Sequence, residues 1–377
     1  MKKLAALLIA GIMVFSLASC GEKKYEEMTA DELIASKIKD KKNVTAEEYA
    51  NLVSTLSNVK INDDLELEDN ITLEAIEKLE EDEDAKLPEL DDYVTKLFES
   101  DAPQVRGYAV SLISGLFGVN DENLKAAKQM IKDEKDAFVI YEAIDALGNE
   151  GGNDAEVGEF LINSAKNDNA LIRKQVAYRL GSSWNKDLEG AVETEIELMS
   201  DKDDEVRSAA YRNAGGLEDE RVIEPIVEML NNDEDVDFHG DGIDSLVDLW
   251  FDYPFHENTS EAAYNATMDY LRRSVPGNKE IPAWIAVTSF RTINEDKFDA
   301  WKAKAAYYNP AEIAEVMTAI AVNPDIDWLA RTGAVEMVSV HCTKEQYDAL
   351  GAAVNALTDS NASFVKNEYE EHLADFE

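Results

Sequence analysis

Apolar residues in the middle of the chain recur at the spacing of helices that bury one face. Four segments, VRGYAVSLIS, VIYEAIDALG, IRKQVAYRLG and VRSAAYRNAG, align on Val105, Val139, Ile172 and Val206, at intervals of 34, 33 and 34 residues. An alanine or valine stands four positions after each of these residues, and a serine or glycine stands nine positions after it. The pattern predicts a helix with one buried stripe that ends at a residue able to adopt a positive φ.

An acidic or amide-rich turn precedes each of these segments. The turns have the sequences ESDAPQ, KDEKDAF, KNDNAL and SDKDDE, and their side chains suit the N-cap of the following helix. Apolar pairs before the turns, such as Leu198 and Met199, are expected to end an earlier helix. The segments lack the alternation that is typical of strands. Each unit is therefore predicted to be a helical hairpin, and the period of about 34 residues predicts a solenoid.

The regular array is predicted to cover residues 97–250, with EPIVEMLNND and GIDSLVDLW as the two helices of a fifth unit. Residues 251–377 lengthen the period and contain prolines that mark loops or helix starts. Their apolar segments still have the pattern of helices, so we expect them to continue the array irregularly and to cap it. Residues 45–96 are predicted to form short N-terminal helices. Capping boxes are expected at Thr29 and Thr45.

The order of Asp, Val-Arg or Ile-Arg, Ala and Gly in these units resembles the short bacterial HEAT-like repeats, which are also known from phycobilisome lyases. The signature residues of tetratricopeptide and ankyrin repeats are missing. The resemblance implies an all-α fold, a right-handed α-α superhelix of helical hairpins, in which Asp and Arg commonly pair between neighbouring units. In the second unit Ile140 replaces the arginine, so a ladder of such pairs should be broken there. The residues that match the motif are Asp101, Arg106, Asp168, Arg173, Asp203 and Arg207.

The first twenty residues have the layout of an export signal. Two lysines precede an apolar run, and the sequence then reads Leu-Ala-Ser-Cys-Gly, which resembles the lipobox of bacterial lipoproteins. The resemblance implies removal of residues 1–19 and attachment of diacylglycerol to Cys20, which would anchor the chain outside the cytoplasm, in the cell envelope. Two acyl chains suffice for stable anchoring. Residues 20–44 are expected to form a polar tether. An ordinary secretory signal that contains a cysteine is the alternative.

Charge narrows the range of partners. The chain has 79 acidic and 36 basic residues and a net charge of −43. Nucleic acids and anionic lipid surfaces reward clustered lysine and arginine, so neither is expected as a partner. The charge favours a basic protein or peptide and leaves divalent ions open as ligands. Besides Cys20 the chain has one cysteine, Cys342, which we interpret as a buried structural thiol.

Motifs that carry catalysis are missing from the sequence. The four histidines form no pair at helical metal-binding spacing. The loop NNDEDVDFHGDGID places Asp233, Asp235 and Asp237 at alternate positions, as in a calcium loop, but Phe238 stands where that loop requires glycine. We therefore interpret it as a turn between helices. Phosphate-binding glycine loops and nucleophile motifs do not occur. The sequence predicts no enzyme activity, no metal site and no cofactor.

The densest aromatic stretch, LWFDYPFH, lies where the regular period ends. Its rings, Trp250, Phe251, Tyr253 and Phe255, are candidates for binding a partner, with packing in the core as the alternative. Two functions remain open. The first is a non-enzymatic envelope lipoprotein that binds a protein or peptide on its solenoid surface. The second is a lipoprotein that captures a solute, a glycan or calcium, or an envelope enzyme of a kind not yet described.

Overall fold

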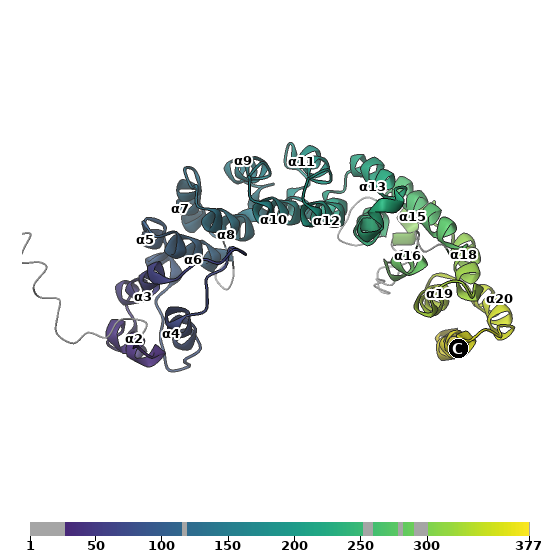
Figure 1. Ribbon diagram of the computed structural model, residues 1–377, viewed down its shortest axis with the longest axis horizontal. Helices are drawn as coiled ribbons and strands as arrows, with labels where there is room; N and C mark the ends of the chain where they lie inside the picture. The colour runs from purple at the N-terminus through teal and green to yellow at the C-terminus, as the bar shows by residue number, and fades with distance from the viewer. Residues whose placement is uncertain (1–26, 115–118, 252–258, 278–281, 290–300, 377) are drawn as a thin grey trace, which may run out of the picture. The chain divides into compact units, whose positions relative to one another are not determined.

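The computed structural model describes residues 27–114, 119–251, 259–277, 282–289 and 301–376 (Figure 1). The described residues form helices joined by short loops, with one isolated antiparallel bridge between Ile61 and Leu67. None of the described helices has the length and hydropathy needed to cross a bilayer. The predicted signal sequence and Cys20 lie outside the described residues. The fold is therefore all-α over the part of the chain that the structure covers.

The chain divides into two compact units, residues 1–146 and 147–377. The first unit contains α2 (Ala30–Lys37), α3 (Ala46–Val53), α4 (Ile71–Glu80), α5 (Val94–Phe98), α6 (Pro103–Ser114), α7 (Asp121–Ile131) and most of α8 (Ala137–Leu147). Both expected capping boxes are confirmed: Thr29 caps α2 with Glu32, and Thr45 caps α3 with Glu48.

Helix α2 is part of the folded first unit. Its residues Leu33 and Ile34 are fully buried, and the helix packs against α4. An ion pair of 2.7 Å between Asp31 and Lys78 joins the same two helices at the surface. Residues 30–37, which fall in the predicted tether, therefore belong to the folded first unit.

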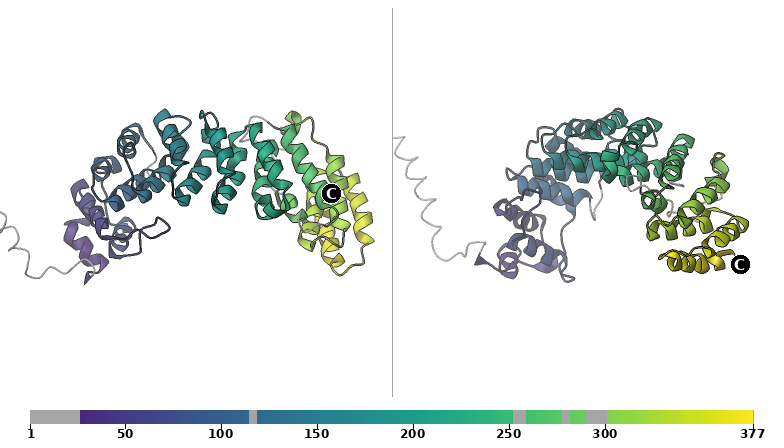
Figure 2. Two further views of the ribbon diagram at one scale, coloured as in Figure 1. Left: turned by 45° about the horizontal axis from the view of Figure 1, so that its top comes forward. Right: turned by 45° about the vertical axis from the view of Figure 1, so that its right-hand side comes forward.

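In the described residues of the second unit the helices pair into six hairpins. Their helices are α9 (Ala155–Ser164), α10 (Ala170–Leu180), α11 (Ala191–Leu198), α12 (Asp204–Asn213), α13 (Ile223–Leu230), α14 (His239–Phe251), α15 (Glu261–Ser274), α16 (Ala283–Ser289), α18 (Pro310–Val322), α19 (Trp328–His341), α20 (Lys344–Asn355) and α21 (Ala362–Glu371). The second helices of the hairpins, α10, α12, α14, α16, α19 and α21, form one layer, and the first helices cover one side of it (Figures 1 and 2).

The repeat positions predicted to be buried are the core of each hairpin. Val105, Val139, Ile172 and Val206 are all fully buried. So are the residues four positions later, Ala109, Ala143, Val176 and Ala210. One apolar stripe of each second helix therefore packs inward, as its spacing predicts.

The glycines at the ends of the second helices have a different role from the one predicted. Gly181 has a φ of −69°, and the described residues with positive φ do not include Gly148, Gly181 or Gly215. A Cβ atom on Gly181 would lie 2.6 Å from the Cβ and backbone oxygen of Asn213. On Gly148 it would lie 2.6 Å from the side chain of Arg179 in the next hairpin. The expectation of a left-handed cap is wrong here, because glycine is needed where neighbouring hairpins approach closely.

Candidate functional site

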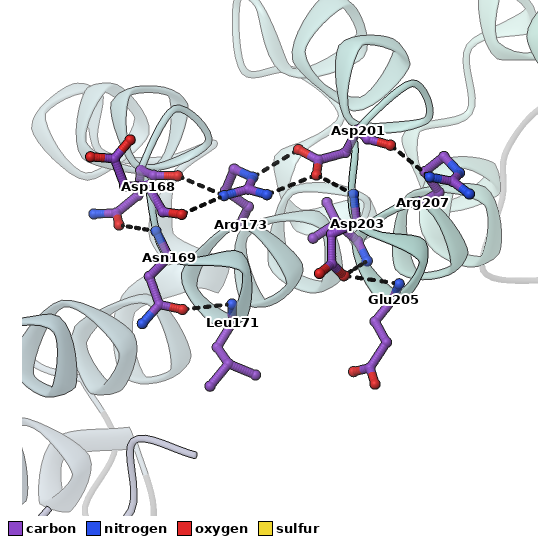
Figure 3. Close-up of polar contacts among 10 residues, drawn as sticks. Asp168, Asn169, Leu171, Arg173, Asp201, Asp203, Glu205 and Arg207 are labelled. Carbon is purple, nitrogen blue, oxygen red and sulfur yellow. Dashed lines mark hydrogen bonds and ion pairs between the residues drawn. The ribbon is translucent and has the colours of Figure 1, made fainter. Parts of the chain in front are cut away.

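Arginines of the second helices bind the next hairpin through a repeated set of contacts (Figure 3). Arg173 of α10 donates from Nε and Nη2 to the carboxylate of Asp201, at 2.7 and 2.8 Å, and from Nη1 to the carbonyl of Asn167, at 2.9 Å. Arg106 of α6 makes the matching bonds to Glu134, at 2.8 and 3.0 Å, and to the carbonyl of Ser100. In both cases the acid lies 28 residues after the arginine.

The same arrangement recurs in α19, beyond the region where the motif is recognisable in the sequence. Arg331 is fully buried and binds the carboxylate of Asp359, again 28 residues later, at 2.8 and 3.1 Å. Its Nε donates to the carbonyl of Ala321 at 2.8 Å. The hydrogen bonds from Arg331 lower the pKa of Asp359 to about 2. The carboxyl group of Asp359 is therefore ionised at neutral pH, and we interpret the ladder as structural.

Three acids expected in this ladder have other roles. Asp203 caps α12, where its Oδ1 accepts the N–H groups of Glu205 and Val206. Asp168 offers its backbone carbonyl to Arg173 at 3.0 Å, and Asp101 is exposed in the turn before α6. The prediction is therefore wrong about which carboxylates bind the arginines. The true partners, Glu134 and Asp201, stand two residues before the capping acids, where each meets the arginine of the preceding hairpin.

Arg207 and Ile140 occupy the arginine position of the ladder in two further repeats. Arg207 donates to the carbonyl of Asp201 at 2.8 Å (Figure 3). It also donates to the carboxylate of Asp204 at 2.6 Å. The acid 28 residues after it, Asp235, has a side chain outside the described residues. In the second repeat Ile140 is buried and offers no guanidinium, so the expected break in the ladder is present.

The aromatic stretch at the end of α14 belongs to the core. Trp250 is fully buried, its Nε1 donates to Thr267 at 3.1 Å, and its ring lies 5.1 Å from the ring of Tyr264. Phe251 is also buried and packs edge-on against Trp301, with the ring centroids 5.0 Å apart. The expectation that Trp250 and Phe251 contact a partner is therefore wrong. Tyr253 and Phe255 lie outside the described residues.

The groups that resembled chemical sites in the sequence have structural explanations. The backbone of Asp233–Phe238 is a 3₁₀ helix, a conformation unlike the open loop that wraps a calcium ion. Cys342 donates to the carbonyl of Pro310 at 3.3 Å, and burial raises the pKa of its thiol to about 12. At neutral pH this cysteine is a protonated, weakly reactive thiol. Within the described residues no three metal-binding side chains come together.

Exposed apolar side chains gather at one edge of the second unit. Trp284, Trp328, Leu329 and Phe364 are 51%, 37%, 55% and 49% exposed, respectively. Each lies in the first turn of its helix, α16, α19 or α21, and these three helices pack side by side in one layer. The rings of Trp328 and Phe364 lie 4.9 Å apart across the α19–α21 contact. We call these four residues the aromatic edge.

A hollow of about 350 Å³ opens beside Trp284 at this edge. This volume lies at the lower end of the range for ligand pockets. The described residues that line it include two carboxylates, Asp325 and Asp327, and no basic side chain. Its described lining residues are Gly277, Pro282, Ala283, Trp284, Asp325, Ile326, Asp327 and Ala330.

Short-range contacts fix the walls of this hollow. Asn323 donates from its side chain to the carbonyl of Val275 at 2.6 Å and accepts the N–H of Asp325 at 2.9 Å. The loop before α19 is thereby tied to the end of α15. Gly277 has a φ of +79°, and a Cβ atom there would lie 2.9 Å from the Cβ of Asp325. Asp327 caps α19 by accepting the N–H of Leu329 at 2.9 Å.

The apolar pattern of the sequence does not reveal the aromatic edge. The segments PAWIAV and WLARTG have the apolar pattern of buried helices, so their tryptophans resembled core residues. One signal was present: Trp284 and Trp328 each stand in the first turn of a helix, directly after a loop that contains proline or aspartate. A bulky ring at that position extends beyond the end of the packed stripe.

Comparison with known proteins supports the repeat assignment. Residues 158–246, which span most of α9 to α14, match the HEAT repeats family model. Two crystal structures of engineered proteins are each 15% identical to the chain. The alignment with the first covers 92% of this chain and 98% of the engineered chain, with a TM-score of 0.33. The alignment with the second covers 76% of this chain and 98% of the engineered chain, with a TM-score of 0.19. No curated protein matches the chain. Residues 158–246 thus match HEAT repeats, and the described part of the chain has the fold of an all-α, HEAT-like solenoid.

Proposed function

We propose that the chain is a lipid-anchored protein of the bacterial cell envelope that binds a basic protein partner through the aromatic edge and catalyses no reaction. HEAT repeats offer a general scaffold for binding other proteins. The lipobox-like sequence at Cys20 supports the anchor and the location outside the cytoplasm. The likeness of the repeats to those of phycobilisome lyases stays a prediction from the sequence.

The aromatic edge is the observation that carries this proposal. Seven large hydrophobic side chains are exposed in the described part of the chain, and four of them lie at this one edge. Tryptophan and phenylalanine are enriched at protein interfaces, and gathered apolar side chains at a surface mark interaction sites. The net charge of −43 favours a basic partner, because opposite charge speeds association and disfavours acidic competitors.

One feature of the first unit favours the alternative of a small captured ligand. A hollow of about 720 Å³ next to α2 and α3 is lined by hydroxyl, amide and charged side chains, among them Asn51, Asn58 and Ser57. The described residues that line it include no aromatic ring that could stack on a sugar. Thermal stabilisation of the protein by sugars or calcium would favour this alternative, and a lack of stabilisation would favour the protein-binding function.

The proposal can be tested by capture from envelope extracts of the source organism. Residues 21–377 would be immobilised and compared with a variant whose aromatic edge is made polar by Trp284→Ser, Leu329→Ser and Phe364→Ser. A matched control would carry Tyr178→Ser, Trp184→Ser and Val340→Ser. Among the described residues, these three are the exposed large hydrophobic side chains that lie outside the aromatic edge.

We expect a basic protein to bind the wild-type chain and the control, and to be lost with the edge variant. Binding should weaken as salt rises, because exposed charges are screened. Equal capture by all three proteins, or capture of nothing in particular by the wild-type chain, would contradict the proposal.

A further inference from the structure

We propose that the hollow beside Trp284 is a recognition pocket for one arginine side chain of the partner. This inference rests on the proposed function and names the chemistry by which the aromatic edge selects its ligand. The pocket combines a half-exposed indole ring with the carboxyl groups of Asp325 and Asp327. The ring and the two carboxyl groups all attract a cation, and the lining residues that the structure describes include no basic side chain.

The lining chemistry favours a guanidinium over other ligands. A guanidinium is planar, stacks on an aromatic face and donates in a fork that matches carboxylates. An anion would be repelled by Asp325 and Asp327. A divalent metal needs more protein ligands than these two acids, and no group of three is found within the described residues. An arginine side chain therefore fits the ring and the two acids together.

The pocket is held open before any ligand arrives. The contacts of Asn323 hold the backbone of Asp325, and Gly277 packs against the same residue, so one wall is fixed. Arg331, one turn along α19 from Asp327, binds Asp359 and fixes the helix that supplies the other wall. A preformed site avoids the entropy cost of ordering its own side chains when the partner binds.

The other residues of the aromatic edge determine which side chains of the partner fit beside the bound arginine. Trp328, Leu329 and Phe364 lie beyond Asp327 and present apolar surface toward solvent. A partner segment with an arginine beside apolar residues would place its guanidinium in the pocket and its apolar side chains against these three. A segment with lysines and no apolar neighbours would use only part of this surface.

The test uses residues 21–377 labelled with 5-fluorotryptophan, observed by fluorine NMR. The chain has five tryptophans, and the Trp284 signal is assigned by its loss in Trp284→Phe. The probes are two peptides, acetyl-Ala-Leu-Arg-Leu-Ala-amide and the same peptide with citrulline in place of arginine. Citrulline keeps the shape of the side chain and removes its charge. The signal of Trp184, which is 64% exposed and lies outside the aromatic edge, is the internal reference.

We expect the arginine peptide to shift the Trp284 signal to saturation and to leave the Trp184 signal in place. The citrulline peptide should bind at least about fivefold more weakly, and so should the arginine peptide to the double variant Asp325→Asn, Asp327→Asn. The control variant Asp63→Asn, Asp64→Asn makes the same change of charge at two exposed residues of the first unit and should bind within about twofold of wild type.

Equal affinity for the two peptides, or a response that the exposed control acids alter as much as Asp325 and Asp327 do, would overturn the inference. Failure of this inference can be told apart from failure of the proposed function. If capture of a partner depends on the aromatic edge but is unchanged by Asp325→Asn with Asp327→Asn, the scaffold function stands and the arginine pocket is refuted. If the arginine peptide binds as expected but no envelope protein is captured, the pocket stands without the proposed partner.

Discussion

Replacing Glu195 with leucine is expected to stabilise the second unit at neutral pH. Glu195 lies on the buried face of α11, is 0% exposed, and neither of its carboxyl oxygens has a hydrogen-bond partner. Glu195 lies eleven residues before Val206, which is the third residue of α12, the second helix of the same hairpin. In three other repeats, the same place is taken by Val94, Leu161 or Leu230, which are all buried, and in the second repeat by Lys128. The carboxyl group of Glu195 therefore lies where three of the other repeats bury an aliphatic side chain.

The size of the effect follows from two contributions. A buried polar group without a partner destabilises a protein by about 1–3 kcal/mol. Burial of a leucine side chain contributes about 1.5–3 kcal/mol. Because the new side chain will not fit perfectly, we expect Glu195→Leu to raise the free energy of unfolding by about 2–4 kcal/mol at pH 7. For a unit of this size, each kcal/mol raises Tm by about 2–4 °C.

The effect depends on pH with a defined sign. Burial raises the pKa of Glu195 well above its ordinary value. Above the ordinary pKa of glutamate, the unfolded state has therefore released the proton of Glu195, whereas the folded state still binds it. Stability of the wild-type protein then falls as the pH rises toward the folded pKa, by at most about 1.4 kcal/mol per pH unit. The advantage of Glu195→Leu should be smallest near pH 4.5 and grow toward pH 7.

Urea denaturation of residues 21–377, followed by circular dichroism at pH 5, 6 and 7, measures this effect. Glu197→Leu is the matched control, because Glu197 lies on the same helix and is exposed. Its effect should stay within about 0.5 kcal/mol at every pH. Glu195→Gln should remove the pH dependence with a smaller gain, since the amide is still unpaired. If Glu195→Leu destabilises the protein, or if its effect is the same at every pH, the carboxyl group is paired or hydrated in solution and the reasoning fails.

Three further predictions concern the repeat architecture. Arg331→Met should lower the free energy of unfolding, measured by urea denaturation, by about 3–5 kcal/mol. Because the pKa of Asp359 is lowered to about 2, the ion pair of the wild-type protein should persist at pH 4 and be lost only as the pH falls toward 2. Gly181→Ala should destabilise by about 1–3 kcal/mol through a clash with the next hairpin, whereas Gly240→Ala, where a Cβ atom meets nothing within 4 Å, should be neutral or slightly stabilising by thermal melting. Cys342 should react with a thiol reagent at pH 8 only after denaturation, because burial raises its pKa to about 12.

The repeat could be predicted from the sequence because it depends on local spacing. A buried stripe at a fixed period specifies both the helix and its inward face, so Ile172 and Val206 were identified as core residues. The reason for the glycines could not be found this way. Gly181 and Gly215 are required by the approach of the next hairpin, and that approach is a property of the stacked units. The sequence of one helix end cannot distinguish this role from a left-handed cap.

The ladder and the binding surface depend on contacts between units. Asp201 and Asp203 are both acids near a helix start, and only the path of Arg173 decides which of them it binds. Trp250 and Trp284 likewise lie in similar apolar segments. Neighbouring helices enclose Trp250, whereas Trp284 stands in the first turn at the edge of its layer. Burial of a single ring is decided by the helices on either side, which its own segment does not encode.

Site-specific photo-crosslinking in intact cells tests whether the aromatic edge binds a protein partner. The full-length chain, including its signal sequence, would carry benzoylphenylalanine at Leu329 of the aromatic edge or, as the control, at Trp184, both of which are well exposed. We expect the probe at position 329 to crosslink a basic envelope protein in the membrane fraction and the probe at position 184 to give no such product. Trp284→Ser with Phe364→Ser should abolish the product. Identical crosslinking from the two positions, or no protein product from position 329, would contradict this expectation.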